Sequence, residues 1–160
     1  MNGDDFVLYE EDVEGIQQEL ARFLSEAQAN CALLVHRSGQ LVAQSGFTRR
    51  LDTTSLAALA AGAFASTEEI ARLLGEPEFN VLFHEGTNAN IHLCLVGEQA
   101  IMVTIFDQRT TLGLVRLCAA ETGQRLHQVF ARALQRDLSS ERAVVGLPTG
   151  DLFRQSARGV

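Results

Sequence analysis

The amino-acid sequence predicts an α/β protein of the α+β type, in which a five-stranded antiparallel sheet is sandwiched between helices. Apolar residues recur at helical spacing near the start, in the middle and towards the end of the chain. Between these stretches lie five shorter apolar runs of strand length. Several of the runs are apolar at both odd and even positions, so both faces of the sheet must be covered. The expected order of elements is α-β-β-α-β-β-β-α.

Length and composition indicate one domain and exclude several classes of function. The chain has 160 residues and a net charge of −7, and all 13 of its basic residues are arginines. It contains no basic run, which makes a nucleic-acid partner improbable. Its apolar runs are too short to cross a membrane, and its acidic N-terminus lacks the basic region of a secretory signal. We therefore expect a cytoplasmic protein that does not insert into membranes.

The first third of the chain predicts a helix and a β-hairpin. Residues 10–29 have apolar side chains at helical spacing, and acidic residues at the start of this segment favour the positive end of the helix dipole. Residues 30–37 and 40–46 are extended segments around a Ser38-Gly39 turn. In the first strand, alternate residues form two apolar sets: Cys31, Leu33 and Val35 on one face, Ala32 and Leu34 on the other.

The central helix is expected over residues 52–75. Asp52 or a following threonine can cap its start, and Gly75 can adopt the left-handed conformation that ends a helix. One face carries apolar residues at helical spacing and is expected to belong to the core. Its residues are Leu56, Leu59, Ala60, Ala63, Thr67, Ile70 and Leu74.

The opposite face of this helix is unusual because two of its turns carry almost no side chains. A glycine inside a helix costs roughly 1 kcal/mol relative to alanine, so Gly62 calls for a reason. Close approach of another protein is one reason, and a neutral choice of alanine on a solvated face is the alternative. The small residues and the charged residues that follow them are Ala58, Ala61, Gly62, Ala65, Glu68, Glu69 and Arg72.

The second half of the chain predicts three strands and a long helix. A short strand, 81–84, follows a break at Gly75 and Pro77. Two longer strands, 90–96 and 100–106, form a hairpin and must be central because both of their faces are apolar. An amphipathic helix follows to about residue 136, and residues 137–160 are expected to be a flexible polar tail, with one amphipathic turn at 151–154.

The short strand 81–84 suits the edge of the sheet and predicts a homodimer. An open edge presents unpaired backbone groups, and this one has no charged residue to prevent pairing with a second copy. Two copies related by a two-fold axis can join their sheets into one. The interface residues expected are Val81, Leu82, Phe83 and His84.

Catalytic and metal-binding motifs receive little support. His84-Glu85 does not continue as H-E-x-x-H, and the three cysteines lie singly in apolar segments, as structural thiols do. A chain without lysine cannot form a conventional nucleotide-binding P-loop. Asp107 and Arg109 lie in a polar turn, where Arg109 could in principle act as an arginine finger. We expect no metal site, no cofactor and no catalytic residues.

Three segments of the sequence resemble the roadblock (dynein light-chain type) family. They are LDTTSLAALAAG from residue 51, FHEG from residue 83 and IFDQRTTLGLVRL from residue 105. Within this family, the chain is similar to bacterial polarity regulators of the MglB type. The resemblance covers residues 6–136, which would form a single roadblock-type domain, and leaves out the tail at 137–160.

The resemblance implies a function that composition and spacing alone do not give. Such regulators are homodimers that bind a small Ras-like GTPase of the MglA type, two regulator subunits per GTPase, and accelerate GTP hydrolysis in cell polarity or motility. They remodel the GTPase and supply no arginine finger. The positions that face the GTPase match Ala61, Ala65 and Glu69, which lie on the small face of the central helix.

Two other functions compete with this one. A roadblock dimer could hold other proteins together without affecting GTP hydrolysis. An enzyme using His84, Glu85 and a cysteine is the third and weakest possibility.

Overall fold

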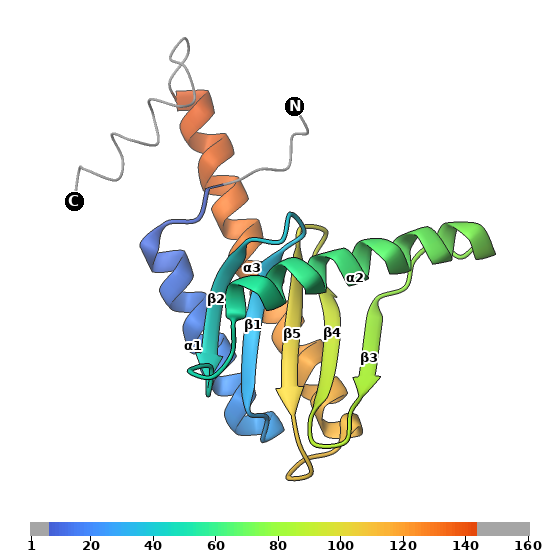
Figure 1. Ribbon diagram of the computed structural model, residues 1–160. Coiled ribbons are helices and arrows are strands. Elements are labelled where there is room, and N and C mark those ends of the chain that lie inside the picture. Colours follow the sequence, from blue (N-terminus) through green and yellow to red (C-terminus); the bar gives the residue numbers. More distant parts are fainter. Residues whose placement is uncertain (1–6, 144–160) are drawn as a thin grey trace.

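The computed structural model describes residues 7–143, and within them the elements follow the predicted order (Figure 1). The strands lie within about a residue of the expected bounds. The first helix ends at Ala27, two residues before its predicted end. The elements are α1 (Glu10–Ala27), β1 (Cys31–His36), β2 (Leu41–Gly46), α2 (Thr53–Leu74), β3 (Val81–Glu85), β4 (Asn90–Val96), β5 (Ala100–Phe106) and α3 (Leu112–Ala143).

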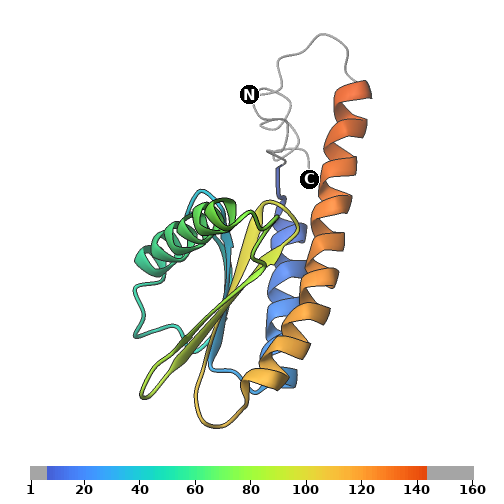
Figure 2. The same ribbon diagram turned by 90° about the vertical axis from the view of Figure 1, so that its right-hand side faces the viewer.

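The five strands form one antiparallel sheet in the order β2-β1-β5-β4-β3. The three strands that are apolar on both faces, β1, β4 and β5, are flanked on both sides by other strands, as predicted for β4 and β5. Helix α2 covers one face of the sheet, and α1 and α3 cover the other (Figure 2). The sandwiched sheet predicted from the sequence is therefore confirmed.

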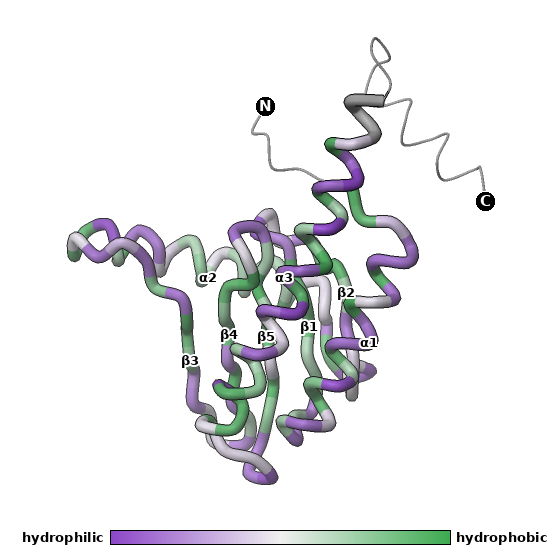
Figure 3. Tube along the Cα trace, turned by 180° about the vertical axis from the view of Figure 1, so that it is seen from behind, coloured by the Kyte–Doolittle hydropathy of each residue, from purple (hydrophilic) through white to green (hydrophobic). Residues whose placement is uncertain are grey.

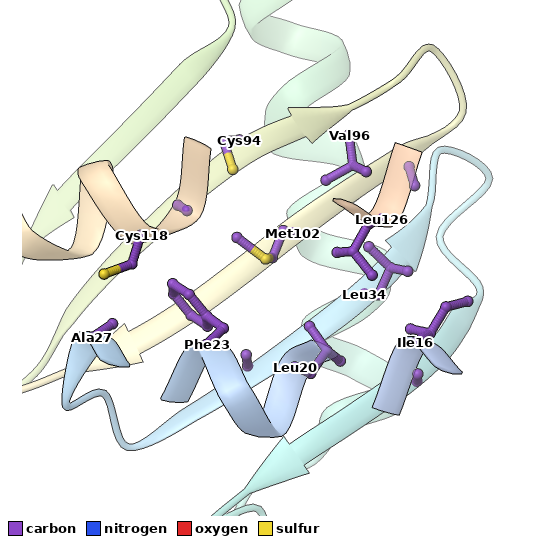
Figure 4. Packing of buried hydrophobic residues seen from close by; sticks show 14 of the residues in the cluster. Ile16, Leu20, Phe23, Ala27, Leu34, Cys94, Val96, Met102, Cys118 and Leu126 are labelled. Carbon is purple, nitrogen blue, oxygen red and sulfur yellow. The ribbon is translucent and has the colours of Figure 1, made fainter. Parts of the chain in front are cut away.

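The larger part of the core lies between the sheet and helices α1 and α3. Buried side chains of α1 and α3 point towards the strands, as Figure 4 shows for Phe23, Leu20 and Leu126 opposite Leu34 and Met102. All five side chains are fully buried. Truncating a buried phenylalanine such as Phe23 to alanine costs about 3–5 kcal/mol in proteins generally. This layer fixes the position of α3 along the sheet.

A second core layer lies under α2. Its sheet residues include Leu33, Val35 and Val103, and its helix residues include Ala57 and Phe64. Leu33 and Val35 lie on the face opposite Ala32 and Leu34, so the two apolar sets predicted for the first strand are confirmed.

Helix α2 begins and ends at the predicted capping residues. The Asp52 carboxylate accepts hydrogen bonds from the Ser55 amide at 3.1 Å and the Ser55 hydroxyl at 2.6 Å. These bonds, first the one from the Ser55 side chain, hold the pKa of Asp52 below its ordinary value. Gly75 adopts φ +72° and donates its amide hydrogen back to the last turn.

The β1–β2 turn packs closely against the start of α2. Gly39 has φ +95°, and a Cβ placed there would lie 3.2 Å from the Cα of Ala58. Both the backbone conformation and the close approach require glycine at this position. The turn therefore fixes where α2 crosses the sheet.

Helix α3 continues to Ala143, past the end predicted near residue 136. The N-terminal segment is tied to its side: the Arg136 guanidinium lies 4.1 Å from the centre of the Tyr9 ring and donates to Asp12 at 2.6 Å. The Val7 amide donates to the Asp137 carboxylate at 2.8 Å. Burial opposes ionisation of Asp12, but the hydrogen bond from Arg136 outweighs it and lowers the pKa of Asp12. These contacts support the helical turns that the sequence assigned to a tail.

The remainder of the predicted tail, including the turn at 151–154, lies outside the described residues. Over residues 7–143, no helix has the length and apolar character needed to cross a membrane.

Candidate partner-binding surfaces on α2 and β3

Helix α2 is only partly supported by its own sheet. It crosses the sheet obliquely, and its C-terminal half extends outward beyond β3 (Figure 1). The side chains that pack in the core layer on the sheet are Ala57, Ala60, Ala61 and Phe64, and Ala71 is also buried. The rest of the helix surface is available to other molecules.

The small face predicted on α2 is exposed, with one exception. Ala58, Gly62 and Ala65 are exposed, and a Cβ built on Gly62 would meet nothing within 4 Å. Ala61 is instead 7% exposed and packs in the core layer under α2, so its assignment to an open face was wrong. Successive residues of a helix are 100° apart, and Ala61 lies on the sheet side of Ala58 and Ala65. From here on, the small face means Ala58, Gly62 and Ala65.

Charged side chains continue the small face towards the end of α2. Glu69 and Arg72 are exposed and form an ion pair with each other. Glu68 instead lies 2.7 Å from Arg37, an ion pair that connects α2 to the end of β1. Glu69 and Arg72 are therefore the accessible charges next to the small face.

The predicted core face of α2 is wrong in part. Leu59, Ile70 and Leu74 are 71%, 52% and 67% exposed, and Leu73 is 86% exposed. We call these four residues the apolar flank. Ile70, Leu73 and Leu74 belong to the second half of α2, which extends beyond the sheet. Leu59 lies in the first half and is exposed because the buried face is rotated towards Phe64. Four large apolar side chains left uncovered on one helix indicate an interaction surface.

Strand β3 is an edge strand, as predicted, and within residues 7–143 it pairs only with β4. Neither α1 nor α3 covers it (Figure 3). Val81 is 40% exposed and His84 is exposed, whereas Phe83 stacks on Phe106 with 6.2 Å between ring centres.

The register of β3 shows which backbone groups face outward. The Leu95 amide donates to the Asn80 carbonyl, so residues 80 and 95 are a hydrogen-bonded pair. Such pairs alternate along an antiparallel ladder, which makes Leu82 and Leu93 the next pair. The backbone groups of Val81 and Phe83 therefore point away from β4 and form the open edge.

Arg109 is bound to its own loop. Its Nε lies 3.0 Å from the Asp107 carboxylate, and a terminal nitrogen donates to the Asn30 side-chain oxygen at 2.9 Å. The hydrogen bonds from Arg109, followed by one from Asn30, lower the pKa of Asp107 to about 2. Asp107 therefore holds Arg109 as a stable ion-pair partner.

The residues proposed for a catalytic or metal site do not converge. His84 and Glu85 are exposed on β3, whereas the three cysteines are buried. Burial raises the pKa of Cys31 to about 11 and of Cys94 to about 12, so both thiols stay protonated at neutral pH. Residues 7–143 contain no group of three or more His, Cys, Asp or Glu side chains that could hold a metal ion.

One residue of these surfaces was absent from the sequence-based prediction. Leu73, the most exposed member of the apolar flank, was assigned to neither face of α2. A signal existed, because adjacent helical residues are 100° apart, so the large side chains of Leu73 and Leu74 cannot both point at the centre of one core.

Comparisons with known proteins agree with this architecture. The model of the Roadblock/LC7 domain matches residues 15–106, more than half of the chain. The structure of Myxococcus xanthus MglB is similar at 40% sequence identity and a TM-score of 0.75, covering 79% of this chain and 96% of that one.

Two further MglB structures are similar over the same region. The gliding protein MglB from Thermus thermophilus has 31% identity and a TM-score of 0.75, covering 81% of this chain and 98% of that one. An MglB described as having a tetrameric arrangement has 30% identity and a TM-score of 0.76, covering 81% and 97% of the two chains. A comparison with curated protein sequences gives no match. The fold, the matched domain and the identity to MglB proteins together show that this chain belongs to the Roadblock/LC7 domain family.

Proposed function

We propose that this protein is a homodimeric activator of a small Ras-like GTPase of the MglA type, and that it acts without catalytic residues of its own. The observation that carries the proposal is the exposed small face of α2 on a chain similar to MglB proteins. Ala58, Gly62 and Ala65 leave the helix backbone open to a partner's loop. Glu69 and Arg72 can then fix the orientation of that partner by charge.

The apolar flank and the edge of β3 support the homodimer. Val81 and Phe83 present unpaired backbone groups, and all of the apolar flank except Leu59 lies in the half of α2 that extends beyond the same edge of the sheet. A two-fold axis beside β3 would pair the two edges and bring the two overhanging helices together. One association would thus cover both surfaces and produce a sheet of ten strands.

Within α2, the surface for the second copy and the surface for the GTPase are distinct. The small face and the apolar flank lie on different sides of the helix axis, with Leu59 one residue from Ala58 and Ile70 one residue from Glu69. A dimer formed through the flank therefore leaves Ala58 and Ala65 accessible, whereas Gly62, which is about 20° from Leu73 around the helix, lies at the border of the two surfaces. Two copies would present two small faces, consistent with two regulator subunits per GTPase.

Stimulation would come from reshaping the GTPase. The Arg109 side chain is held by Asp107 and Asn30 at the loop between β5 and α3. A partner bound on the small face of α2 would meet alanine, glycine and an ion pair, none of which provides proton transfer. The rate increase must then arise from the GTPase's own residues, positioned by binding.

Single-turnover GTP hydrolysis by a purified MglA-type GTPase tests the proposal. We expect the rate to rise with the concentration of this protein and to saturate at two chains per GTPase. Binding without a change in the hydrolysis rate would contradict activation and favour the scaffold function. Absence of binding would contradict both.

A further inference from the structure

A cleft lies between α3 and the β3–β4 edge, on the face of the sheet opposite α2. It has a volume of about 760 Å³. His92 and Cys94 of β4 lie along its floor, and Val81 of β3 borders its outer side. Its helical wall is formed largely by small residues of α3, including Ala119 and Gly123. We call it the α3 cleft.

His92 is the unusual residue of this cleft. It is 1% exposed, and neither of its ring nitrogens has a hydrogen-bond partner in the described part of the chain. Thr104, directly opposite on β5, has a buried hydroxyl that also lacks a hydrogen-bond partner in the described part of the chain. A buried polar group without a partner costs about 1–3 kcal/mol. A ligand in the cleft would supply the missing partner.

The charge of the α3 cleft is opposite to that of the protein as a whole. The chain carries a net charge of −7, yet Arg116 is the single charged residue among the described residues that line the cleft. Arg116 is exposed and has no ion-pair partner within residues 7–143. His92, Cys94 and His127 are the other titratable residues of the lining. The cleft therefore suits a negative group.

We propose that the α3 cleft binds an acidic segment of a partner protein, with an Asp or Glu carboxylate held between Arg116 and His92. The carboxylate would accept charge-assisted hydrogen bonds from the guanidinium and from an imidazole N–H. Apolar side chains next to the acidic residue would pack on Val81 and on the small residues of the helical wall. Ala119 and Gly123 allow a peptide backbone to approach α3 closely.

This inference is independent of the proposed GTPase activation. Helix α2 lies on one face of the sheet and the α3 cleft on the other (Figure 2). A segment bound in the cleft leaves the small face and the apolar flank uncovered. The cleft and the small face can thus be occupied together, and each can fail its test without affecting the other, although Val81 both borders the cleft and belongs to the proposed dimer edge.

A pair of peptides tests the proposal on the full chain. The probes are acetyl-Leu-Asp-Leu-Phe-amide and its Asn counterpart, titrated to millimolar concentrations while the His92 ring resonances are followed by NMR. We expect the Asp peptide to shift the His92 signals and to raise the pKa of His92 from about 4 towards its ordinary value of 6.5. The Asn peptide should bind about tenfold or more weakly, because it lacks the charge.

Variants of α3 complete the test. Arg116→Gln should weaken binding of the Asp peptide about tenfold or more. Arg132→Gln, which removes an exposed arginine of the same helix outside the cleft, should leave binding unchanged. Unperturbed His92 signals with both peptides would overturn the proposal. Equal binding of the two peptides, or binding that is insensitive to Arg116→Gln, would also overturn it.

Discussion

Arg109 donates a hydrogen bond of 2.9 Å to the side-chain oxygen of Asn30, a residue that precedes β1. Together with the ion pair to Asp107, this bond holds the guanidinium on the protein's own surface. We therefore predict that Arg109→Ala leaves stimulation of GTP hydrolysis largely intact. An arginine finger supplied in trans is worth about 10³–10⁵ in rate. A single-turnover assay at saturating regulator distinguishes the two roles, and a loss of roughly a hundredfold or more would make Arg109 catalytic.

The small face of α2 should lose its partner when long side chains are introduced. We predict that Ala65→Arg combined with Glu69→Arg abolishes GTPase binding and stimulation. Both residues are exposed and arginine is a good helix former, so the fold should be retained. Loss of the Glu69–Arg72 ion pair costs about 1 kcal/mol at most, because both side chains are exposed.

Binding is measured by titration calorimetry, and dimer mass by light scattering. Glu121→Arg with Gln135→Arg on α3 is the matched control, since it changes the net charge equally at exposed positions. A folded double variant of α2 that still stimulated hydrolysis would show that the GTPase docks elsewhere.

Charges on the apolar flank should separate the dimer. Ile70 and Leu73 are exposed in the single chain, so Ile70→Glu with Leu73→Glu leaves the core under α2 intact. In a dimer the same carboxylates would be buried without partners, which is strongly unfavourable. We expect monomers by light scattering at concentrations where the parent chain is dimeric. The control pair Leu114→Glu with Leu117→Glu, on α3, should remain dimeric.

Proline substitutions distinguish the two sides of β3. Val81 directs its N–H outward, whereas Leu82 directs its N–H to Leu93. We predict that Val81→Pro weakens the dimer but leaves the chain folded, because proline is tolerated at the start of an edge strand. Leu82→Pro should instead lower the melting temperature by breaking the β3–β4 ladder. If Val81→Pro dimerised as tightly as the parent chain, the dimer would not use this edge.

Protonation of His92 should destabilise the fold. Burial, followed by the nearby charge of Arg116, lowers the pKa of His92 from 6.5 to about 4. Between these two values the unfolded chain binds more protons than the folded one, so stability is complete above pH 6.5 and falls as the pH decreases to 4. The loss amounts to roughly 3 kcal/mol.

Urea denaturation at pH 7 and pH 5 measures the larger part of this loss, about 2 kcal/mol. His92→Leu should remove the part of the pH dependence of the unfolding free energy that comes from His92. The part that comes from the surface carboxylates should remain. Equal pH dependence in the two proteins would show that His92 is accessible to protons in the folded state.

The sequence predicts most of the fold because the spacing of apolar residues along the chain indicates which faces of the helices and strands are buried. Alternation in β1, with Leu33 on one face and Leu34 on the other, required two covering layers, and both are present. Capping chemistry at Asp52 and Gly75 placed the ends of α2 to within a residue. Strand alternation and helix capping depend only on residues close together in the sequence, so both can be recognised without knowing the tertiary structure.

The residues of α2 that were wrongly assigned to the core show that an apolar helical repeat does not distinguish a face that packs on the protein's own sheet from a face that packs on another molecule. Leu59 and Ile70 follow the helical repeat as core residues would, but both are exposed because the buried side of the helix is the one that carries Ala57, Ala60 and Phe64. Ala61 was assigned to the wrong face because alanine is compatible with burial and with exposure. The α3 cleft could not be found from sequence, since it depends on how α3 crosses the sheet relative to β3.

The overhang of α2 also has a kinetic consequence. Helical turns with little tertiary support open readily, and isolated short helices are marginal in water. The backbone amides from Ser66 to Leu74 should therefore exchange with deuterium faster than those around Ala57 and Phe64 when the protein is dilute. Their protection should rise with protein concentration. Hydrogen exchange along this one helix would then report how strongly the chain associates.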